Sequence, residues 1–358
     1  MKKIESSKSI ENTIRTAKNK SEISAEDLWK SDPEIIRQFL DVRHEYEQLC
    51  AEVEYILKKK ISHQKIETSF IGSRAKTLNS FVEKLQRKSY GNPLKELTDL
   101  AGARVVCLYS GDLAAVADII RTEFTIIEEI NKLAEFDPNQ FGYGAMHFIV
   151  KLGKTSSGAR YDDLRNYACE IQVRTVVQDA WAIIQHHMAY KKESQIPSQL
   201  HRKLNSLAGL FETVDDQFNA IRSQRDTYLS SIRESANVQK DFLENELNYD
   251  SLIEYLKWAF SDRDSGEAGV EIVLDALKQL NYKTLRDVND AVEATKEGRE
   301  NILTEMMRLL PDRGRPMDSN FEVAVAISLT DEQGMSAIPW GPTWIDVINR
   351  YKTHKTAE

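Results

Sequence analysis

The chain has 358 residues, of which 41% are hydrophobic and 29% are charged, and these proportions exclude an intrinsically disordered protein. Lysine and arginine number 48 against 56 aspartates and glutamates, so the formal net charge of −8 argues against non-specific coating of nucleic acid. No apolar run approaches the length of a membrane span, and we expect no membrane partner.

The cysteines and the first residues of the chain indicate the compartment. Cys50, Cys107 and Cys169 are widely spaced and form no CxxC pair, so neither a zinc knuckle nor a disulfide framework is expected. Residues 1–19 are polar and lysine-rich and lack the apolar core of a signal peptide. We therefore expect a cytoplasmic protein with reduced thiols.

The first segment, residues 1–60, is predicted to be helical. Ser24 stands before Ala25, Glu26 and Asp27, which is typical of a helix N-cap followed by an acidic first turn. Apolar residues then recur at helical spacing over about 33–60, which predicts one or two amphipathic helices.

A second segment, residues 61–232, mixes the two kinds of pattern. The expected strands are 68–71, 104–109, 125–130, 148–152 and 169–173. One helix is expected to begin at Leu78, and three more are expected at 113–124, 176–191 and 204–232. Strands interleaved with helices predict an α+β domain built on a mixed sheet.

The third segment, residues 240–358, has few strand signals. Apolar residues recur at helical spacing on both sides of a polar loop at 261–269, which predicts a mainly helical second domain. The run 323–329 is expected to be its one strand. Trp340, Pro342 and Trp344 form an aromatic-rich cluster that we attribute to core packing, with a partner-docking patch as the alternative.

The richest chemical signal is CEIQVRT at residues 169–175. Strand alternation puts Glu170, Gln172 and Arg174 on one face. A carboxylate, an amide and a guanidinium on one strand face suit a polar pocket wall, and a solvent-facing strand is the alternative. His186 lies in the helix expected to follow, where a lone histidine is more often structural.

A second signal is TDLAGARVV at residues 98–106. Asp99 stands just before an expected strand, and Arg104 lies at its start. Asp99 and Glu170 together could hold one Mg²⁺, which takes one or two protein carboxylates besides phosphate oxygens and water. A surface pair between Asp99 and Arg104 is an equally weighted alternative.

Two further segments carry charge or aromatic character. The segment SRAKTLNSFVEKLQRK, residues 73–88, carries five cations: Arg74, Lys76, Lys84, Arg87 and Lys88. These cations favour a site that binds a polyphosphate, and a solvated helix face is the alternative. In FGYGAMH, residues 141–147, Tyr143 and His147 flank small residues, so a ring could lie against a ligand base or simply join the core. The chain has neither a dinucleotide-binding glycine fingerprint nor a phosphate-binding GxxxxGK[ST] loop.

In this order, the four segments resemble the synthetase domain of the RelA/SpoT family of alarmone enzymes. The pattern is R-x-K with a basic helix, D-x-x-G-x-R, G-Y-x-x-x-H, and E-[IV]-Q-[IV]-R-T followed by a tryptophan and H-x-x-x-Y-K. Those last residues are here Trp181, His186, Tyr190 and Lys191. The resemblance covers about 65–225 and implies a nucleotidyltransferase-like mixed sheet flanked by helices.

The resemblance implies an enzyme, a GTP/GDP diphosphokinase that makes (p)ppGpp. ATP would donate its β,γ-pyrophosphate to the 3′-hydroxyl of GDP or GTP, leaving AMP. Asp99 and Glu170 would coordinate Mg²⁺ and catalyse transfer, with Glu170 activating the acceptor hydroxyl. ATP would be bound by Arg74, Lys76, Lys84 and Arg104. The acceptor would be bound by Tyr143, His147, Gln172, Arg174 and His186.

Departures from the family pattern define the alternatives. The segment 135–141, before Tyr143, is acidic where many relatives are basic. A toxic pyrophosphokinase acting on the 3′ end of tRNA is therefore a second hypothesis, with the C-terminal domain as a fused inhibitor or phage sensor. Its basic surface would be Lys58, Lys59, Lys60, Lys84, Arg87 and Lys88.

Other functions are less favoured by these residues. No histidine is followed by aspartate, as in the hydrolase domains of long family members, so no alarmone hydrolysis is expected. Asp99 and Glu170 are both present, which argues against a catalytically silent binding module. The sequence leaves open the acceptor, allosteric regulation, homo-oligomer formation and a protein ligand of the C-terminal domain.

Overall fold

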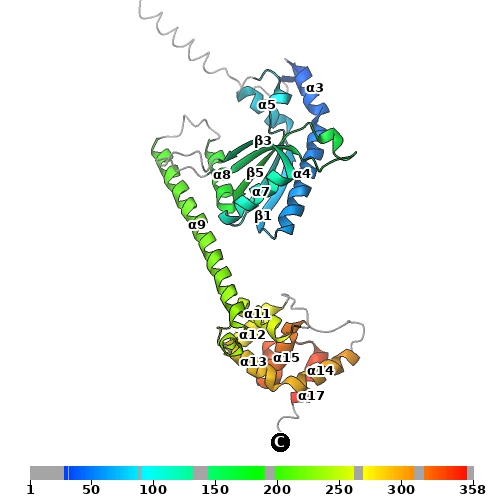
Figure 1. Cartoon of the computed structure of the whole chain (residues 1–358), viewed down its shortest axis with the longest axis vertical. Helices are drawn as coiled ribbons and strands as arrows, with labels where there is room; N and C mark the ends of the chain where they lie inside the picture. The colour runs from blue at the N-terminus through cyan, green and yellow to red at the C-terminus, as the bar shows by residue number, and fades with distance from the viewer. Residues whose placement is uncertain are drawn as a thin grey trace, which may run out of the picture. The chain divides into compact units, whose positions relative to one another are not determined.

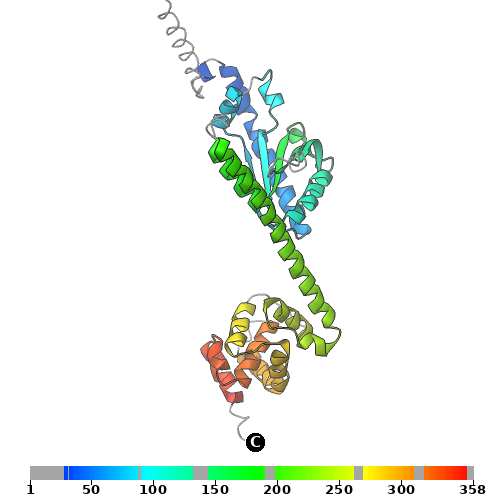
Figure 2. The same cartoon turned by 90° about the vertical axis from the view of Figure 1, so that its left-hand side faces the viewer.

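The computed structural model describes residues 28–30, 32–87, 90–131, 144–189, 198–261, 269–309 and 318–352. The chain forms two compact units, Met1–Ile221 and Arg222–Glu358 (Figures 1 and 2). Within the described ranges no helix combines the length and the apolar character needed to cross a membrane.

Two helices follow the short helical stretch 28–30 at the start of the described part of the first unit. Helix α3 (Pro33–Asp41) starts with proline at its first turn, and the side chain of Asp32 accepts a hydrogen bond from the Ile35 amide at 3.4 Å. Helix α4 (Arg43–His63) follows almost at once. The amphipathic pattern over 33–60 is therefore confirmed as two helices, whereas the expected cap at Ser24 lies outside the described residues.

The sheet of the first unit has five strands in the order β1-β2-β5-β4-β3. Strands β2 and β5 are parallel and all other neighbours are antiparallel, so the predicted mixed sheet is confirmed. The strands are β1 (Thr68–Ala75), β2 (Ala101–Cys107), β3 (Phe124–Asn131), β4 (Met146–Leu152) and β5 (Cys169–Thr175). The helices among them are α5 (Leu78–Arg87), α6 (Pro93–Glu96), α7 (Leu113–Glu123), α8 (Val176–Ala189) and α9 (Ser198–Ser235), with short 3-10 turns η1 (Ser110–Asp112) and η2 (Asp162–Leu164).

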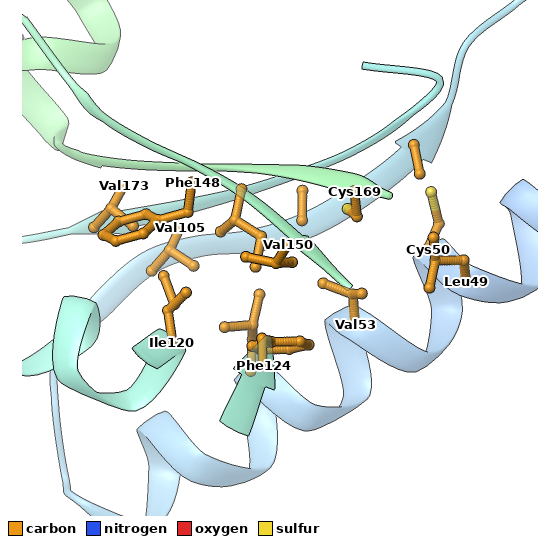
Figure 3. Packing of buried hydrophobic residues seen from close by; sticks show 14 of the residues in the cluster. Leu49, Cys50, Val53, Val105, Ile120, Phe124, Phe148, Val150, Cys169 and Val173 are labelled. Carbon is orange, nitrogen blue, oxygen red and sulfur yellow. The ribbon is translucent and has the colours of Figure 1, made fainter. Parts of the chain in front are cut away.

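One face of the sheet builds the hydrophobic core. Alternate residues of β2, β4 and β5 point towards helices α4 and α7, as Figure 3 shows for Val105, Val150 and Val173 beside Val53 and Ile120. Cys50, Cys107 and Cys169 are free thiols buried in the same core. Because side chains alternate along a strand, the intervening residues of these strands face the other way. We call that side the polar face.

Helices α8 and α9 pack against each other in the first unit. Val177 and Trp181 of α8 form a small apolar cluster with Ala208 of α9, and the rings of Trp181 and Phe211 lie 5.6 Å apart. At the end of β5, the Thr175 hydroxyl donates to the buried carboxylate of Asp215 at 2.7 Å. This contact attaches α9 to the sheet.

The second unit is helical, as predicted. Its helices are α10 (Gln239–Leu243), α11 (Tyr249–Ala259), α12 (Val270–Gln279), α13 (Leu285–Ala294), α14 (Lys296–Leu309), α15 (Ser319–Thr330), α16 (Gly334–Ala337) and α17 (Pro342–Lys352). The expectation of a strand at 323–329 is wrong, because this run lies inside α15. Helix α15 is buried on nearly every side, so its apolar residues show no helical period and read locally like a strand.

The aromatic cluster of the second unit packs as core. Trp340 and Trp344 both lie against Phe321 of α15, with ring centroids 4.9 and 4.5 Å from it. The Trp340 indole also donates a hydrogen bond to the Ser328 hydroxyl at 2.9 Å. These contacts support the core-packing interpretation for the two tryptophans.

Candidate active site

Two lysines converge on Asp99 just before strand β2. The ammonium of Lys76 lies 2.7 Å from Oδ2 of Asp99, and that of Lys84 lies 2.6 Å from the same oxygen. Lys76 follows β1 directly, and its amide bonds to the Leu100 carbonyl at 2.8 Å, so the two strand ends are held side by side. Lys84 reaches across from α5. The alternative of a surface pair between Asp99 and Arg104 is therefore wrong.

Burial and the two lysines act in opposite directions on Asp99. Burial alone would raise the pKa of this carboxyl, but the ammonium groups of Lys76 and Lys84 outweigh it and hold the pKa below its usual range. Asp99 is therefore ionised at neutral pH. Its second oxygen, Oδ1, is buried and has no hydrogen-bond partner among the described residues.

Glu170 lies on the polar face of β5 and is paired with a histidine from β4. Its Oε1 is 2.7 Å from Nδ1 of His147. The strand register explains this contact, because His147 lies opposite Gln172, one position along the same face from Glu170. The pattern predicted for Glu170, Gln172 and Arg174 is confirmed, since these residues alternate with buried neighbours.

The charge of Glu170 responds both to His147 and to Asp99. Burial raises the pKa of Glu170 most strongly, yet the hydrogen bond and charge of His147 bring the net pKa below its usual range. The negative charge of Asp99 raises the same pKa, so the two carboxylates are close enough to interact electrostatically. The strand register places Glu170 opposite Gly102, three residues after Asp99, so the two motifs lie near the same end of β2 and β5.

Farther along the polar face, one carboxylate joins two guanidinium groups. Asp179, in the first turn of α8, lies 3.0 Å from Arg104 and 3.4 Å from Arg174. Arg174 also donates to Gln172 at 2.6 Å. Burial and then the positive charge of Arg104 lower the pKa of Arg174, which shows that the two cations repel each other.

Asp179 was not among the predicted site residues. A local signal for it exists, because Asp179 lies in the first helical turn after the strand that carries Arg174, so its carboxylate can contact that guanidinium. The sequence alone did not show that the neighbouring strand brings Arg104 to the same carboxylate. That contact depends on the parallel pairing of β2 with β5, which places Arg104 opposite Gln172.

The remaining predicted residues lie partly outside this network. Arg74 is exposed on β1, opposite Gly102 of β2, and it borders a hollow of about 520 Å³ beside α4. Tyr143, Lys88 and Tyr190 lie outside the described residues, as do the side chains of Arg87 and His186. Among the described residues no cluster of three or more histidines, cysteines or carboxylates could hold a metal.

The fold and this site define an α+β protein with a charged site on one face of a mixed sheet. Residues 73–195 match the family described as a region found in RelA/SpoT proteins. GTP pyrophosphokinase YjbM of Bacillus subtilis (strain 168) is 30% identical over 168 residues, which cover 45% of this chain and 74% of that protein. GTP pyrophosphokinase YwaC of the same organism is 28% identical over 160 residues, covering 43% and 73%. This chain belongs to the RelA/SpoT family.

A solved structure resembles the chain as well. The crystal structure of small alarmone synthetase 1 from Bacillus subtilis, bound to its product pppGpp, is 25% identical. It covers 52% of this chain and 98% of that one, with a TM-score of 0.44.

Proposed function

We propose that this chain is a GTP pyrophosphokinase that transfers the β,γ-pyrophosphate of ATP to the 3′-hydroxyl of GDP or GTP, making (p)ppGpp and AMP. The observation that carries the proposal is the pair of lysines at Asp99, together with the strand register that places Glu170 opposite Gly102, three residues after Asp99. The names of the sequence relatives, both GTP pyrophosphokinases, support the same reaction.

Asp99 and Glu170 are suited to hold a divalent metal. Both pKa values are held below their usual range, so both groups are anionic at neutral pH. Oδ1 of Asp99 is a buried oxygen without a hydrogen-bond partner among the described residues, which suits a hard cation that prefers oxygen ligands. When bound there, Mg²⁺ supplies positive charge that neutralises the ATP phosphates.

The basic residues around the carboxylates would bind and orient ATP. The ammonium groups of Lys76 and Lys84 lie beside Asp99, and each can rotate to contact a phosphate oxygen when ATP binds. Arg104 and the exposed Arg74 complete the set on neighbouring strands. Holding ATP in line with the acceptor supplies much of the rate acceleration in phosphoryl-type transfers.

Glu170 would receive the proton of the acceptor. The 3′-oxygen bonds to the β-phosphorus of ATP while the bond from that phosphorus to the α,β-bridging oxygen breaks. AMP leaves, and the hydroxyl proton passes to a carboxylate oxygen of Glu170. His147 holds the other side of this carboxylate, and Gln172, Arg174, Tyr143 and His186 would bind the acceptor.

Modification of tRNA is less well supported by the described residues. A tRNA-binding surface needs free cations, but Lys58 pairs with Glu54 and Lys60 pairs with Glu123, each at 2.7 Å. These contacts reduce the basic surface that the tRNA hypothesis needs.

The experiment uses the full chain with Mg²⁺ and ATP labelled in its β- and γ-phosphates, offered GDP, GTP or deacylated tRNA. We expect the label to appear on the guanosine nucleotides. In Glu170→Gln the rate of transfer should fall by at least about 100-fold, because the carboxylate that accepts the proton is removed. Glu128→Gln, at an exposed position of β3, is the matched control and should keep full activity. Label on tRNA alone, or full activity in Glu170→Gln, would contradict the proposal.

A further inference from the structure

Helix α8 begins directly after strand β5, with no loop between them. The last residue of the strand, Thr175, caps the helix. Its hydroxyl oxygen accepts a hydrogen bond from the Gln178 amide at 3.0 Å, and its own amide donates to the Gln178 side-chain oxygen at 2.9 Å. This reciprocal capping box satisfies two backbone amides at the start of the helix. Because the capping residue also ends the strand, it fixes the direction in which α8 leaves the sheet.

A carboxylate from a second helix binds to this cap. The Thr175 hydroxyl donates its proton to Asp215 of α9 at 2.7 Å. Thr175 is fully buried, and Gln178 and Asp215 are each only 4% exposed. Burial of a carboxylate costs free energy, whereas the cap itself needs only the hydroxyl and the glutamine. Asp215 therefore adds something that capping does not require: it orients the Thr175 hydroxyl and holds the first turn of α8 to α9.

The same turn of α8 carries the carboxylate that joins two arginines of the candidate site. Asp179 lies four residues after Thr175, and its carboxylate lies 3.0 Å from Arg104 of β2 and 3.4 Å from Arg174 of β5. Successive residues of a helix are about 100° apart around its axis, so a small rotation of this turn moves the carboxylate away from the guanidinium groups. The orientation of the cap therefore decides whether Asp179 contacts both arginines.

We propose that Asp215 is a positioning residue of the candidate active site. Through Thr175 it fixes the first turn of α8, and that turn places Asp179 between the two arginines. This role rests on the proposed function, in which Arg104 binds ATP. Because Asp215 is buried and acts only through these contacts, its loss should weaken the binding of ATP more than it slows the transfer step.

Steady-state kinetics of the full chain tests this role. We expect Asp215→Ala to raise KM for ATP by about 10-fold and to change kcat by less than about two-fold, since a binding group displaced by about 1 Å is enough for such a loss. Thr175→Val removes the hydroxyl at nearly constant volume and should have the same effect, whereas Thr175→Ser keeps the hydroxyl and should recover most of the loss. Asp216→Ala, at the exposed neighbouring position of α9, is the matched control and should behave like the unmodified chain.

Hydrogen exchange measured by mass spectrometry reports on the cap without ATP. In Asp215→Ala and Thr175→Val the amides of the first turn of α8 should exchange faster, while the strands of the sheet keep their protection. Protection of the strands shows that a variant is folded and that its kinetics can be compared. Unchanged exchange in the first turn of α8 would overturn the role of Asp215.

A double variant separates positioning from a general loss of stability. If Asp215 acts through Asp179, kcat/KM for ATP in Asp215→Ala/Asp179→Asn should lie within about two-fold of Asp179→Asn alone, whereas independent effects multiply. Effects that multiply, a fall in kcat at constant KM, or equal kinetics in Asp215→Ala and Asp216→Ala would overturn the role of Asp215 and leave the proposed function standing. An unmodified chain without pyrophosphokinase activity would instead overturn the proposed function and this role with it.

Discussion

At the scale of single residues, the site depends on which neighbour pairs with each carboxylate and keeps it ionised. Glu170 is buried enough for its pKa to rise, and His147 is the contact that reverses the effect. A carboxylate kept ionised by one neighbour can bind metal and accept a proton over the whole neutral range. Removing that neighbour should therefore change the pH dependence of the reaction as well as its rate.

We expect His147→Ala to move the acidic limb of the pH profile of kcat/KM to higher pH. The folded-state pKa of Glu170 is depressed, so its ionised form persists below the ordinary value of 4.5 and is lost only as pH falls further. Without His147, burial dominates and protonation begins at higher pH. The measurement is kcat/KM for ATP against pH, and an acidic limb that does not move would contradict this role of His147.

At the scale of elements, the polar face is held together by contacts between helix α8 and strands β2 and β5. Among the described residues of α8, Asp179 alone forms an ion pair with either strand, and it contacts Arg104 of β2 and Arg174 of β5. The two guanidinium groups repel each other, so the carboxylate between them keeps both near the site. We regard Asp179 as a positioning residue for Arg104 and Arg174.

We expect Asp179→Asn to lower kcat/KM for ATP by about 10- to 100-fold, because a shift of about 1 Å in a binding group is enough for such a loss. The effect should fall mainly on KM for ATP, since Arg104 is proposed to bind ATP rather than to take part in proton transfer. Asp118→Asn removes a carboxylate from an exposed ion pair with Arg121 and serves as the control. Equal kinetics in the two variants would contradict a positioning role for Asp179.

At the scale of the whole molecule, each unit has its own hydrophobic core. The family match at residues 73–195 lies within the first unit, so we expect the second unit to serve regulation or the binding of a protein ligand. The second unit also contains a buried ion pair between Arg299 of α14 and Glu322 of α15, whose side chains are 8% and 1% exposed. Arg299 donates in addition to the Val292 carbonyl of α13 at 3.0 Å, so one guanidinium joins three helices.

Calorimetry of the full chain should resolve two unfolding transitions, and Arg299→Met should destabilise only that of the second unit. The free energy of unfolding of the second unit should fall by about 3–5 kcal/mol, because the variant leaves Glu322 buried without this partner. The double variant Arg299→Met/Glu322→Leu should recover most of that free energy. Arg286→Met breaks an exposed pair with Glu244 in the same unit and should cost less than about 1 kcal/mol. A loss spread over both transitions would show that the units unfold together.

Much of the first unit could be predicted from local patterns. All five strands were predicted near their observed positions, and so was the polar side of β5, because strand alternation and helical spacing depend on neighbours a few residues away. Apart from Asp179, the acidic and basic residues of the site could be named for the same reason: their motifs are contiguous. Helix α15 could not be predicted in this way, since burial on nearly every side removes the period by which a helix is recognised.

The pairing of these residues required the tertiary structure. Asp99 and Glu170 are far apart in the sequence, and they lie near the same end of two neighbouring strands because the sheet order places β5 beside β2. The same order brings Arg104 to Asp179 instead of Asp99, and the packing of α5 brings Lys84 to Asp99. Strand order is decided by the burial of the whole sheet against α4 and α7, a property of the folded chain that no local segment contains.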